Sequence, residues 1–483
     1  MQRKALYILL TILPAFAGCE KYLDQAPDSS WTQLDTPEKV SQLLGTAYPQ
    51  ANYMTFCEAM SDNVMDKGTG VDARTNRDPF YFNDVQNINE DSPEYYWQAA
   101  YKAIAAANNA LIACENAKDT AAYSRQKGEA LVARAYSHFM LVNLFSKSYD
   151  ATTANADMGI PYVTEPEDVV FRQYDRKTVA YVYEQIEKDL LAGLPLIRDD
   201  KYKVPSYHFT QKAAYAFAAR FYLYKRDYSK VVMYADMAFP TSQTGTYLRP
   251  WNTSYVFMSP LELFNIYTNS SEKANLLLVE TASSYGRYVG RYRFGMNYPM
   301  YYEILGRGNV TGGGWCFPVY TYSTNDYFVP KVSEYFVKQS VNANIGFIYT
   351  MVPLFTAEEL LFNRVEANAN LGNTAAALAD LNLYASTRIT NYNPSTHNIT
   401  LAKSKTYYGV TDNREALLSV LFDFKRAEFV QEGLRWFDLM RYKVPVTHVT
   451  RDGETLELGA EDPRRVFQLP VTAKTSGLPM NPR

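Results

Sequence analysis

The sequence has 483 residues and a nearly balanced charge, with 48 lysines and arginines against 51 aspartates and glutamates and a formal net charge of -3. Because the chain has no overall positive field to attract a phosphate backbone, its composition argues against a nucleic-acid partner. The length is sufficient to bury a substantial core in one compound domain or in two. The four cysteines include no C-x-x-C pair, so neither a zinc site nor a disulfide framework is indicated. We expect the three cysteines after residue 19 to be small buried apolar residues.

The first residues have the pattern of a secretory signal. Residues 1–4 are Met-Gln-Arg-Lys, and residues 5–17 form an apolar stretch interrupted only by a threonine and a proline. A membrane-spanning helix needs about 20 apolar residues, so this stretch is too short, and later apolar runs are broken by charge. Phe16-Ala17-Gly18-Cys19 resembles the bacterial lipobox, whose cysteine carries the lipid and becomes the first residue of the mature chain. We therefore predict a signal peptide over residues 1–18, lipidation of Cys19 and membrane contact through the lipid alone. The alternative is a plain secreted protein with an incidental cysteine.

Helical periodicity dominates the rest of the chain. Trp97, Tyr101 and Ile104 follow one another at spacings of four and three, which places them on one face of a helix. Gly372 is expected to end one helix in a left-handed conformation, and Asn373 to cap the next. Small residues on one helix, a tight turn and a second helix rich in Ala, Leu and Tyr resemble tetratricopeptide repeats. We therefore predict a mainly α protein with about four tetratricopeptide-like helix pairs, near residues 92–146, 175–239, 357–390 and 413–443.

Two regions interrupt the helical pattern and are predicted to be long loops. They cover residues 57–94 and 240–350, and both contain glycines, accompanied in the second by many tyrosines. Long loops on a rigid helical frame are a common way to form a binding face. The sequence therefore predicts one compound domain over residues 19–483, in which the helix pairs support a loop-rich, ligand-binding half.

Aromatic residues in these loops are the candidate ligand contacts. The chain contains 41 tyrosines, and a tyrosine combines an apolar ring face with a hydroxyl, as suits the apolar face and polar rim of a sugar. Trp315 is the first candidate because it follows three glycines in the longer loop and is not easily explained by helix packing. Trp97 also fits a core role, because it starts an apolar helical stripe. The other candidates are Tyr81, Phe82, Tyr292, Tyr298 and Tyr320.

No motif indicates a catalytic residue, a cofactor or a metal site. The chain lacks G-x-S-x-G, H-E-x-x-H and a phosphate-binding loop. His138 lies on an apolar helix face, where a hydrogen-bonded core histidine is expected. A glycoside hydrolase needs only two carboxylates at a set separation, so it is the enzyme alternative. Carboxylates outside a motif are by default surface charges, and we therefore predict a protein that is not an enzyme.

The C-terminal stretch over residues 425–443 is the most specific part of the sequence. It reads as an amphipathic helix that stops at Gly433, followed by a second helix in which Arg435, Asp438 and Arg441 can pair at i, i+3 spacing while Trp436 faces inward. A dense mixture of Arg, Glu and Trp more often forms a buried packing and salt-bridge network than a catalytic site.

This stretch is similar to the C-terminal signature of the SusD/RagB family of outer-membrane nutrient-binding lipoproteins. The similar residues are Glu428-Phe429-Val430-Gln431-Glu432-Gly433, then Arg435-Trp436, Asp438-Leu439 and Arg441. Cys19 with Leu23-Asp24 and Pro27 resembles the mature start of the family, and Asn481-Pro482 its closing segment. Phe424 departs from the pattern, because an acidic residue often opens this motif, and the loop segments match nothing specific.

The resemblance implies a fold and a role. Members are mostly helical, with four tetratricopeptide-like pairs, and act as lids on TonB-dependent, SusC-like transporters, to which they deliver oligosaccharides or, in some branches, peptides. Cys19 would then hold the lid at the mouth of its transporter on the outer membrane. A peptide-binding member, a glycoside hydrolase and a protein-interaction scaffold are the alternatives. Arg287, Arg291 and Arg293 alternate with tyrosines over residues 285–298, which could favour an acidic glycan. A strand with one solvated face or a transporter-contact edge is the other interpretation.

Overall fold

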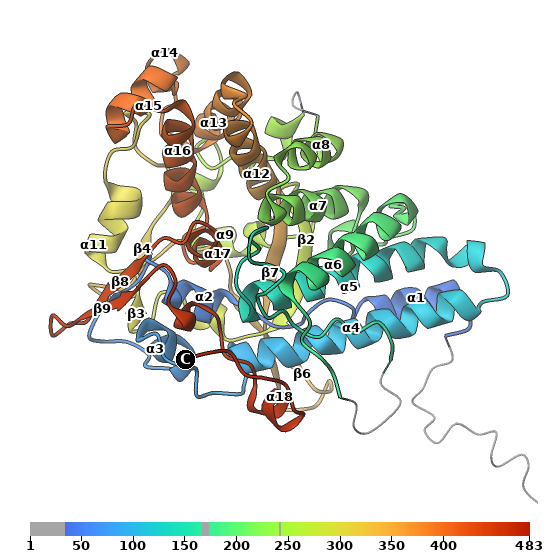
Figure 1. The fold of residues 1–483 in the computed structure, drawn as a ribbon. Coiled ribbons are helices and arrows are strands. Elements are labelled where there is room, and N and C mark those ends of the chain that lie inside the picture. Colours follow the sequence, from blue (N-terminus) through green and yellow to red (C-terminus); the bar gives the residue numbers. More distant parts are fainter. Residues whose placement is uncertain (1–33, 167–172, 241–242) are drawn as a thin grey trace, which may run out of the picture.

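The structure is a computed structural model that describes residues 34–166, 173–240 and 243–483. The predicted signal peptide and Cys19 lie outside these residues. Helices are the main elements, as Figure 1 shows, which confirms the prediction of a mainly α protein. Among the helices of the described ranges, none is long and apolar enough to cross a membrane.

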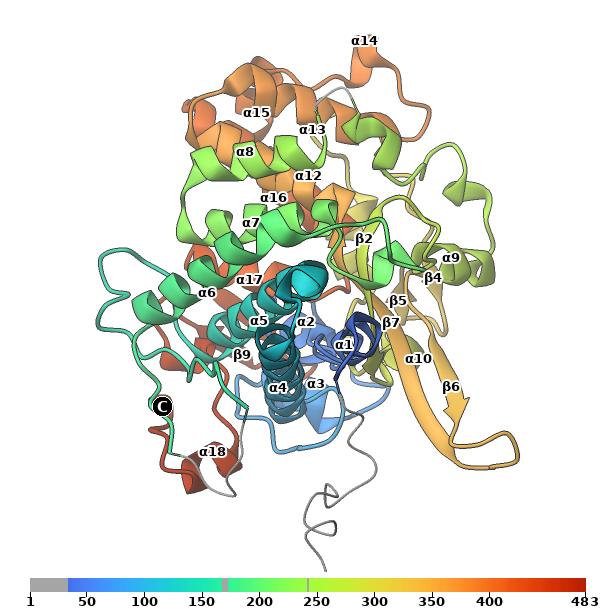
Figure 2. The same ribbon diagram turned by 90° about the vertical axis from the view of Figure 1, so that its right-hand side faces the viewer.

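The longer helices pack against their neighbours along the chain. These packed sets are α4 (Pro93–Asn116) with α5 (Ser124–Phe145), α6 (Val179–Gly193) on α5, α7 (Gln211–Lys225) with α8 (Tyr228–Ala238), α12 (Ala357–Asn370) with α13 (Thr374–Arg388), and α16 (Asn413–Glu428) on α12 and α13. Figure 2 shows them as successive layers, from α4 and α5 up to α12, α13 and α16. The stretch 175–239 was expected to hold one helix pair but contains three α-helices. Of these, α7 and α8 form a pair, and α6 packs on α5.

Local sequence explains where these helices begin and end. The Ser92 hydroxyl accepts a hydrogen bond from the Tyr95 amide at 3.1 Å, and Pro93 opens α4. Gly372 has a φ of +79°, the left-handed conformation that the sequence predicts between α12 and α13. Asn373 occupies the expected N-cap position of α13, but its side chain donates to Asn368 at 3.1 Å and makes no cap.

The remaining helical elements are short and lie mostly between the packed sets. The α-helices are α1 (Pro37–Leu44), α2 (Met54–Met60), α3 (Arg74–Phe80), α9 (Pro260–Tyr267), α10 (Tyr285–Tyr288), α11 (Tyr298–Tyr301), α14 (Pro394–His397), α15 (Leu401–Tyr408), α17 (Leu434–Arg441) and α18 (Val471–Thr475). The 3-10 helices are η1 (Thr120–Tyr123), η2 (Leu194–Leu196), η3 (Pro205–Tyr207), η4 (Thr244–Tyr247), η5 (Tyr255–Phe257) and η7 (Pro463–Arg465), and η6 (Tyr302–Gly306) is a π-helix.

The region 240–350, expected as a long loop, contains much of the β structure. A three-stranded antiparallel sheet has the order β2 (Asn275–Ala282), β7 (Gly346–Thr356), β6 (Glu334–Lys338), with Val279 opposite Val352. The apolar run from Leu276 to Val279 is buried, as is typical of a strand with both faces covered. Three two-stranded pairs complete the β structure: β1 (Met65–Asp66) with β3 (Phe294–Gly295), β4 (Tyr320–Thr321) with β5 (Tyr327–Phe328), and β8 (Val446–Val449) with β9 (Thr455–Leu458).

Two hydrophobic cores matter for the site. The larger core fills the space between the helix layers, and a second, smaller core lies under α11, η6, β4 and β5. Trp251 and Tyr267 form the centre of this second core, which we call the satellite core. Cys57, Cys114 and Cys316 are free and buried, as predicted for small apolar residues.

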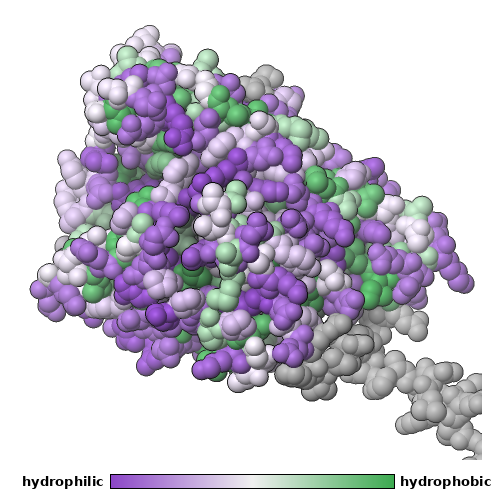
Figure 3. Space-filling view, in the orientation of Figure 1, coloured by the Kyte–Doolittle hydropathy of each residue, from purple (hydrophilic) through white to green (hydrophobic). Residues whose placement is uncertain are grey.

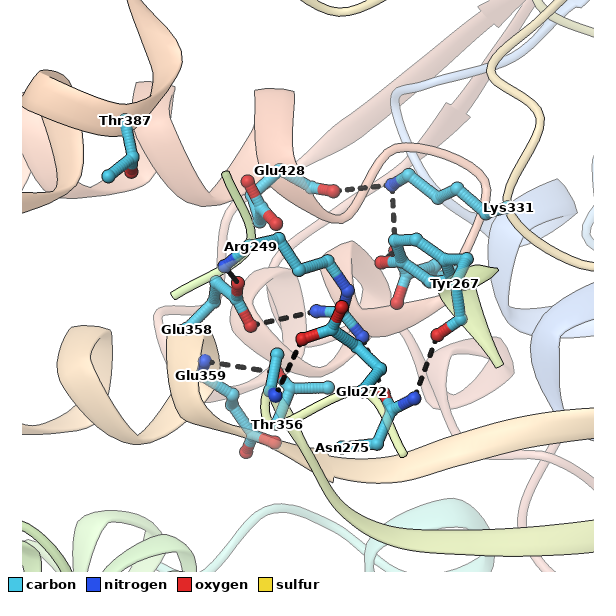
Figure 4. Close-up of polar contacts among 12 residues, drawn as sticks. Arg249, Tyr267, Glu272, Asn275, Lys331, Thr356, Glu358, Glu359, Thr387 and Glu428 are labelled. Atoms are coloured by element: carbon cyan, nitrogen blue, oxygen red, sulfur yellow. Dashed lines mark hydrogen bonds and ion pairs between the residues drawn. The ribbon is translucent and has the colours of Figure 1, made fainter. Parts of the chain in front are cut away.

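A buried ion-pair network connects the helices of the upper layer. Arg388 on α13 contacts Glu428 on α16 at 2.7 Å and Glu358 on α12 at 2.9 Å, and Glu358 also contacts Arg249 at 2.8 Å. These four side chains have no exposed surface. Figure 4 shows Arg249, Glu358 and Glu428 turned toward one another, with Lys331 beside Glu428. Burial acts to raise the pKa of Glu428, but the Arg388 charge and hydrogen bonds outweigh it and leave the pKa below its usual value. This part of the C-terminal stretch is therefore structural.

Candidate functional site

A group of aromatic side chains lies above the satellite core, on the side of the molecule that carries α11 and β4 in Figure 1. Trp315, Tyr301, Tyr320 and Tyr327 are each partly buried against this core. We call the surface that they form with Tyr298 and Tyr302 the aromatic surface. Because its base is packed, the rings are held in fixed positions while part of each stays accessible.

The sequence "NYPMYY", residues 297–302, explains how three of these rings meet. The Asn297 side chain accepts from the Met300 amide at 3.1 Å and starts α11. Tyr298, Tyr301 and Tyr302 then follow at positions i, i+3 and i+4, which lie on one helical face. The chain continues directly into the π-helix η6, a form that often occurs at functional sites.

Four of the tyrosine rings, Tyr298, Tyr301, Tyr302 and Tyr327, form a contiguous cluster. The Tyr298 and Tyr302 ring centres are 6.3 Å apart with 27° between the ring planes, and Tyr301 stacks on Tyr327 at 5.1 Å. Tyr298 and Tyr302 are 54% and 53% exposed. Within the described residues, neither of their hydroxyls has a hydrogen-bond partner. These two side chains therefore offer an apolar face and a free polar edge to a ligand.

Trp315 is half-buried at the margin of this surface. Its ring meets Phe424 of α16 edge-on at 5.1 Å, and the flanking backbone pairs with the end of α13, where the Cys316 amide donates to Arg388 at 3.0 Å. The expectation that Trp315 has no helix-packing role is therefore wrong. Trp315 also lines a small hollow together with Glu303, Arg307, Asp423 and Arg426, so part of its ring stays accessible at that point.

The other candidates are divided between this surface and the core. Tyr320 lies on β4 at the aromatic surface, and Tyr81 is half-buried beside Phe294, at the end of α3. Phe82, Trp97 and Tyr292 are 3%, 8% and 3% exposed and pack against other aromatic rings. A buried ring has no free face for stacking, so we leave these three out of the site.

Tyr301, Tyr302 and Tyr327 were missed by the sequence reasoning. The i, i+3, i+4 spacing from Tyr298 could have identified Tyr301 and Tyr302. Tyr327 had no local signal, because its contact with Tyr301 depends on β5 returning to α11.

The arginines of residues 285–298 are all engaged. Arg287 pairs with Glu334 at 2.6 Å, Arg293 pairs with Asp66 at 2.7 Å, and Arg291 lies 4.3 Å from the Tyr322 ring centre. The segment holds α10 and β3 and is not one strand with a solvated face. Hydrophilic residues cover most of the face in Figure 3, with hydrophobic residues in small separate areas. Among the described residues, no group of three His, Cys, Asp or Glu side chains could hold a metal ion.

The packed helix pairs define a mainly α protein of the tetratricopeptide-like class, with an exposed tyrosine cluster on one side. Two sequence families match the chain: a SusD-like family described as starch-binding and associating with the outer membrane, over residues 21–223, and the SusD family, over residues 318–463. The chain belongs to the SusD/RagB family. No curated protein matches it in sequence.

Solved structures from Bacteroides species have the same fold. A SusD superfamily protein from Bacteroides thetaiotaomicron is 19% identical, with a TM-score of 0.66, covering 93% of this chain and 100% of its own. A protein from Bacteroides vulgatus described as a putative sugar binding protein is 19% identical, with a TM-score of 0.71, covering 93% and 99%. A SusD-like carbohydrate binding protein from the same species is 16% identical, with a TM-score of 0.63, covering 91% and 96%. At these identities the likeness establishes the fold.

Proposed function

We propose that this protein is a surface-exposed outer-membrane lipoprotein that binds neutral oligosaccharides and passes them to a TonB-dependent, SusC-like transporter. The observation that carries the proposal is the exposed pair Tyr298 and Tyr302 on the packed satellite core. Neighbouring exposed rings with free hydroxyls suit the apolar faces and polar rims of consecutive sugars. Two proteins of the same fold are described as sugar or carbohydrate binding, which supports this ligand class. A protein-interaction scaffold would not need such a surface.

Charge favours a neutral ligand. The three arginines of residues 285–298 already have acidic or aromatic partners. A charge-assisted contact to an acidic glycan would require breaking these interactions. The aromatic surface itself consists of uncharged side chains, with Arg307 and Glu303 at its margin.

We further propose that the ligand is bound without being cleaved. The carboxylates beside Trp315 have partners: Glu303 pairs with Arg426 at 2.5 Å, and Asp423 accepts from the Tyr408 hydroxyl at 2.7 Å. The test is to incubate the purified protein with a glycan that it binds and to analyse the glycan by chromatography. Recovery of the intact glycan is expected, and shortened products would favour a glycoside hydrolase. Binding of peptides in place of glycans would favour the peptide-binding branch.

The lipid anchor gives a first cellular prediction. Cys19→Ala should release the protein from the membrane fraction, because the cysteine sulfur is the proposed site of acylation. Its melting temperature should be unchanged, since residue 19 precedes every described element. Fractionation followed by immunoblotting measures the release. A variant that still sediments with membranes after a high-salt wash would place the anchor elsewhere.

The β6–β7 hairpin, residues 334–349, is the surface that we assign to the transporter. It projects beyond the helices in Figure 2. Phe336, Val341, Ile345 and Phe347 are among its large exposed apolar residues, and Lys338 is the sole charge between residues 335 and 349. An exposed apolar area of this kind is typical of a protein contact. Its near absence of charge fits an apolar protein surface and not a polyanion.

This assignment predicts the loss of a complex. Phe336→Ser combined with Phe347→Ser should abolish co-purification of the transporter in mild detergent, because both rings are 53% exposed and available for contact. The melting temperature and glycan binding should not change. The control is Phe257→Ser combined with Leu261→Ser, two exposed apolar residues outside the hairpin. Equal recovery of the transporter with both double variants would contradict the assignment.

A further inference from the structure

A pocket of about 540 Å³ lies between the segment 82–94 and the C-terminal segments 464–471 and 480–483. Its volume falls within the range of about 300–1,000 Å³ that is typical of small-molecule sites. None of the residues of the aromatic surface lines it. Val471, the first residue of α18, lines the pocket, and in Figure 1 α18 lies at the bottom whereas α11 lies at the left. We propose that this pocket is a second, separate binding site for a neutral oligosaccharide, an inference that rests on the proposed function.

The first wall is a loop held at both ends by residues in unfavourable backbone conformations. Phe82 has a φ of +54° and Asp91 a φ of +65°. Left-handed residues other than glycine are uncommon and concentrate at functional sites. The Phe82 ring stacks on His448 at 4.5 Å, and Asp91 accepts from the Ser283 hydroxyl at 2.5 Å. The loop between them is therefore fixed where it starts and ends.

The second wall is held by the C-terminal segment. The Gln468 side chain accepts from the Asn481 amide at 2.9 Å and donates to the Asn481 carbonyl at 3.0 Å. Arg483 crosses between the walls, pairing with Asp84 at 2.7 Å and donating to the Val466 carbonyl at 3.1 Å. The pocket is therefore formed before any ligand arrives, which lowers the cost of binding.

The charges at the pocket favour an uncharged ligand. Of its two arginines, Arg483 is paired with Asp84, and Arg464 is paired with Asp462 at 2.7 Å. Both cations are thus neutralised within the protein, whereas Glu94, which also lines the pocket, accepts from the Gln98 side chain at 3.3 Å and has no cationic partner among the described residues. An anionic ligand would have to compete with these carboxylates.

The polar groups of the pocket match sugar hydroxyls. Within the described residues, the side-chain amides of Asn83 and Asn89 have no hydrogen-bond partner. Each amide offers both donors and an acceptor, and each sugar hydroxyl can also donate and accept. Phe82 and Phe467, which are only 3% and 7% exposed, support the pocket from below and offer no ring face for stacking. A ligand is therefore held mainly by hydrogen bonds to the polar groups of the pocket, which suits a sugar better than an apolar peptide side chain.

The test uses variants of a chain that starts at residue 20, because this chain keeps every described element. Each variant alters only one of the two proposed sites. Isothermal titration is performed with maltoheptaose, cellohexaose, xylohexaose and mannohexaose. The parent should show two binding events for an oligosaccharide that it binds. Asn83→Ala combined with Asn89→Ala should remove one of these events or weaken it about tenfold, because the ligand loses hydrogen bonds to the two amides. The matched control is Asn342→Ala combined with Asn344→Ala, two exposed asparagines at the hairpin tip. Tyr298→Ala combined with Tyr302→Ala should leave the event at the pocket.

Each contrary outcome has a distinct meaning. If the parent binds an oligosaccharide with one event that only the tyrosine variant weakens, the pocket site is refuted while the proposed function stands. If the asparagine variant loses binding to a peptide pool and not to a glycan, the proposed ligand class is wrong. If no oligosaccharide of the panel binds the parent, both proposals fail together.

Discussion

Arg388→Met is expected to lower the free energy of unfolding by about 3–5 kcal/mol, because it leaves buried carboxylates without their cation. Arg388 has no exposed surface and contacts both Glu358 and Glu428. It also donates to the Arg249 carbonyl at 2.8 Å, so its loss would leave this acceptor unsatisfied as well. The effect should extend to the whole upper layer, since the three ion-paired residues lie on α12, α13 and α16.

Denaturant unfolding of the purified variant measures this change. The matched control is Arg287→Met, which breaks a pair of similar length, Arg287 with Glu334, but at a site where the arginine is 40% exposed. Exposed pairs contribute about 0–1 kcal/mol. If Arg388→Met costs no more than Arg287→Met, the network does not hold the helix layers together.

Acid should act on the same network. The pKa of Glu428 is lowered in the folded protein, because the Arg388 charge overcomes the effect of burial. A carboxylate of lowered pKa stabilises the fold above its unfolded pKa of about 4.3, and this contribution is lost as the pH falls through the folded value. The parent should therefore lose stability below about pH 4.3, and Arg388→Met should lose less over that range.

The sequence predicted the helix layers because their signals are local. The spacing of Trp97, Tyr101 and Ile104 lies within α4, and Gly372 adopts its predicted left-handed conformation. Ion pairs were less predictable. Asp438 pairs with Arg441 at 2.7 Å as expected, but Arg435 pairs with Asp62, which is far away in the chain.

The candidate site was less predictable from the sequence because aromatic residues occur both in the core and at the exposed surface. Trp97 and Tyr298 both come from aromatic-rich segments, yet Trp97 packs on Phe145 in the core while Tyr298 is exposed. Only the packing of the chain decides which ring faces the solvent. Similarly, glycines before Trp315 suggested a free loop, whereas the ring meets Phe424, a residue more than a hundred positions later.

Replacing two exposed rings should have the largest effect on binding. Tyr298→Ala combined with Tyr302→Ala should weaken neutral-oligosaccharide binding at the aromatic surface at least about tenfold, since lost aromatic contacts of binding hot spots cost about 1–2 kcal/mol or more each. The melting temperature should change little, because both side chains are more than half exposed. Tyr181→Ala is the matched control, since Tyr181 is 40% exposed but lies on α6, outside the aromatic surface.

The most direct test of the account is titration calorimetry of the soluble parent with neutral oligosaccharides, acidic oligosaccharides and peptides, repeated with these two variants. We predict that the parent binds a neutral oligosaccharide. Tyr181→Ala should retain this binding, and Tyr298→Ala combined with Tyr302→Ala should lose the binding at the aromatic surface. Unchanged binding by the double variant, or binding of peptides alone, would contradict the assignment of this surface to neutral glycans.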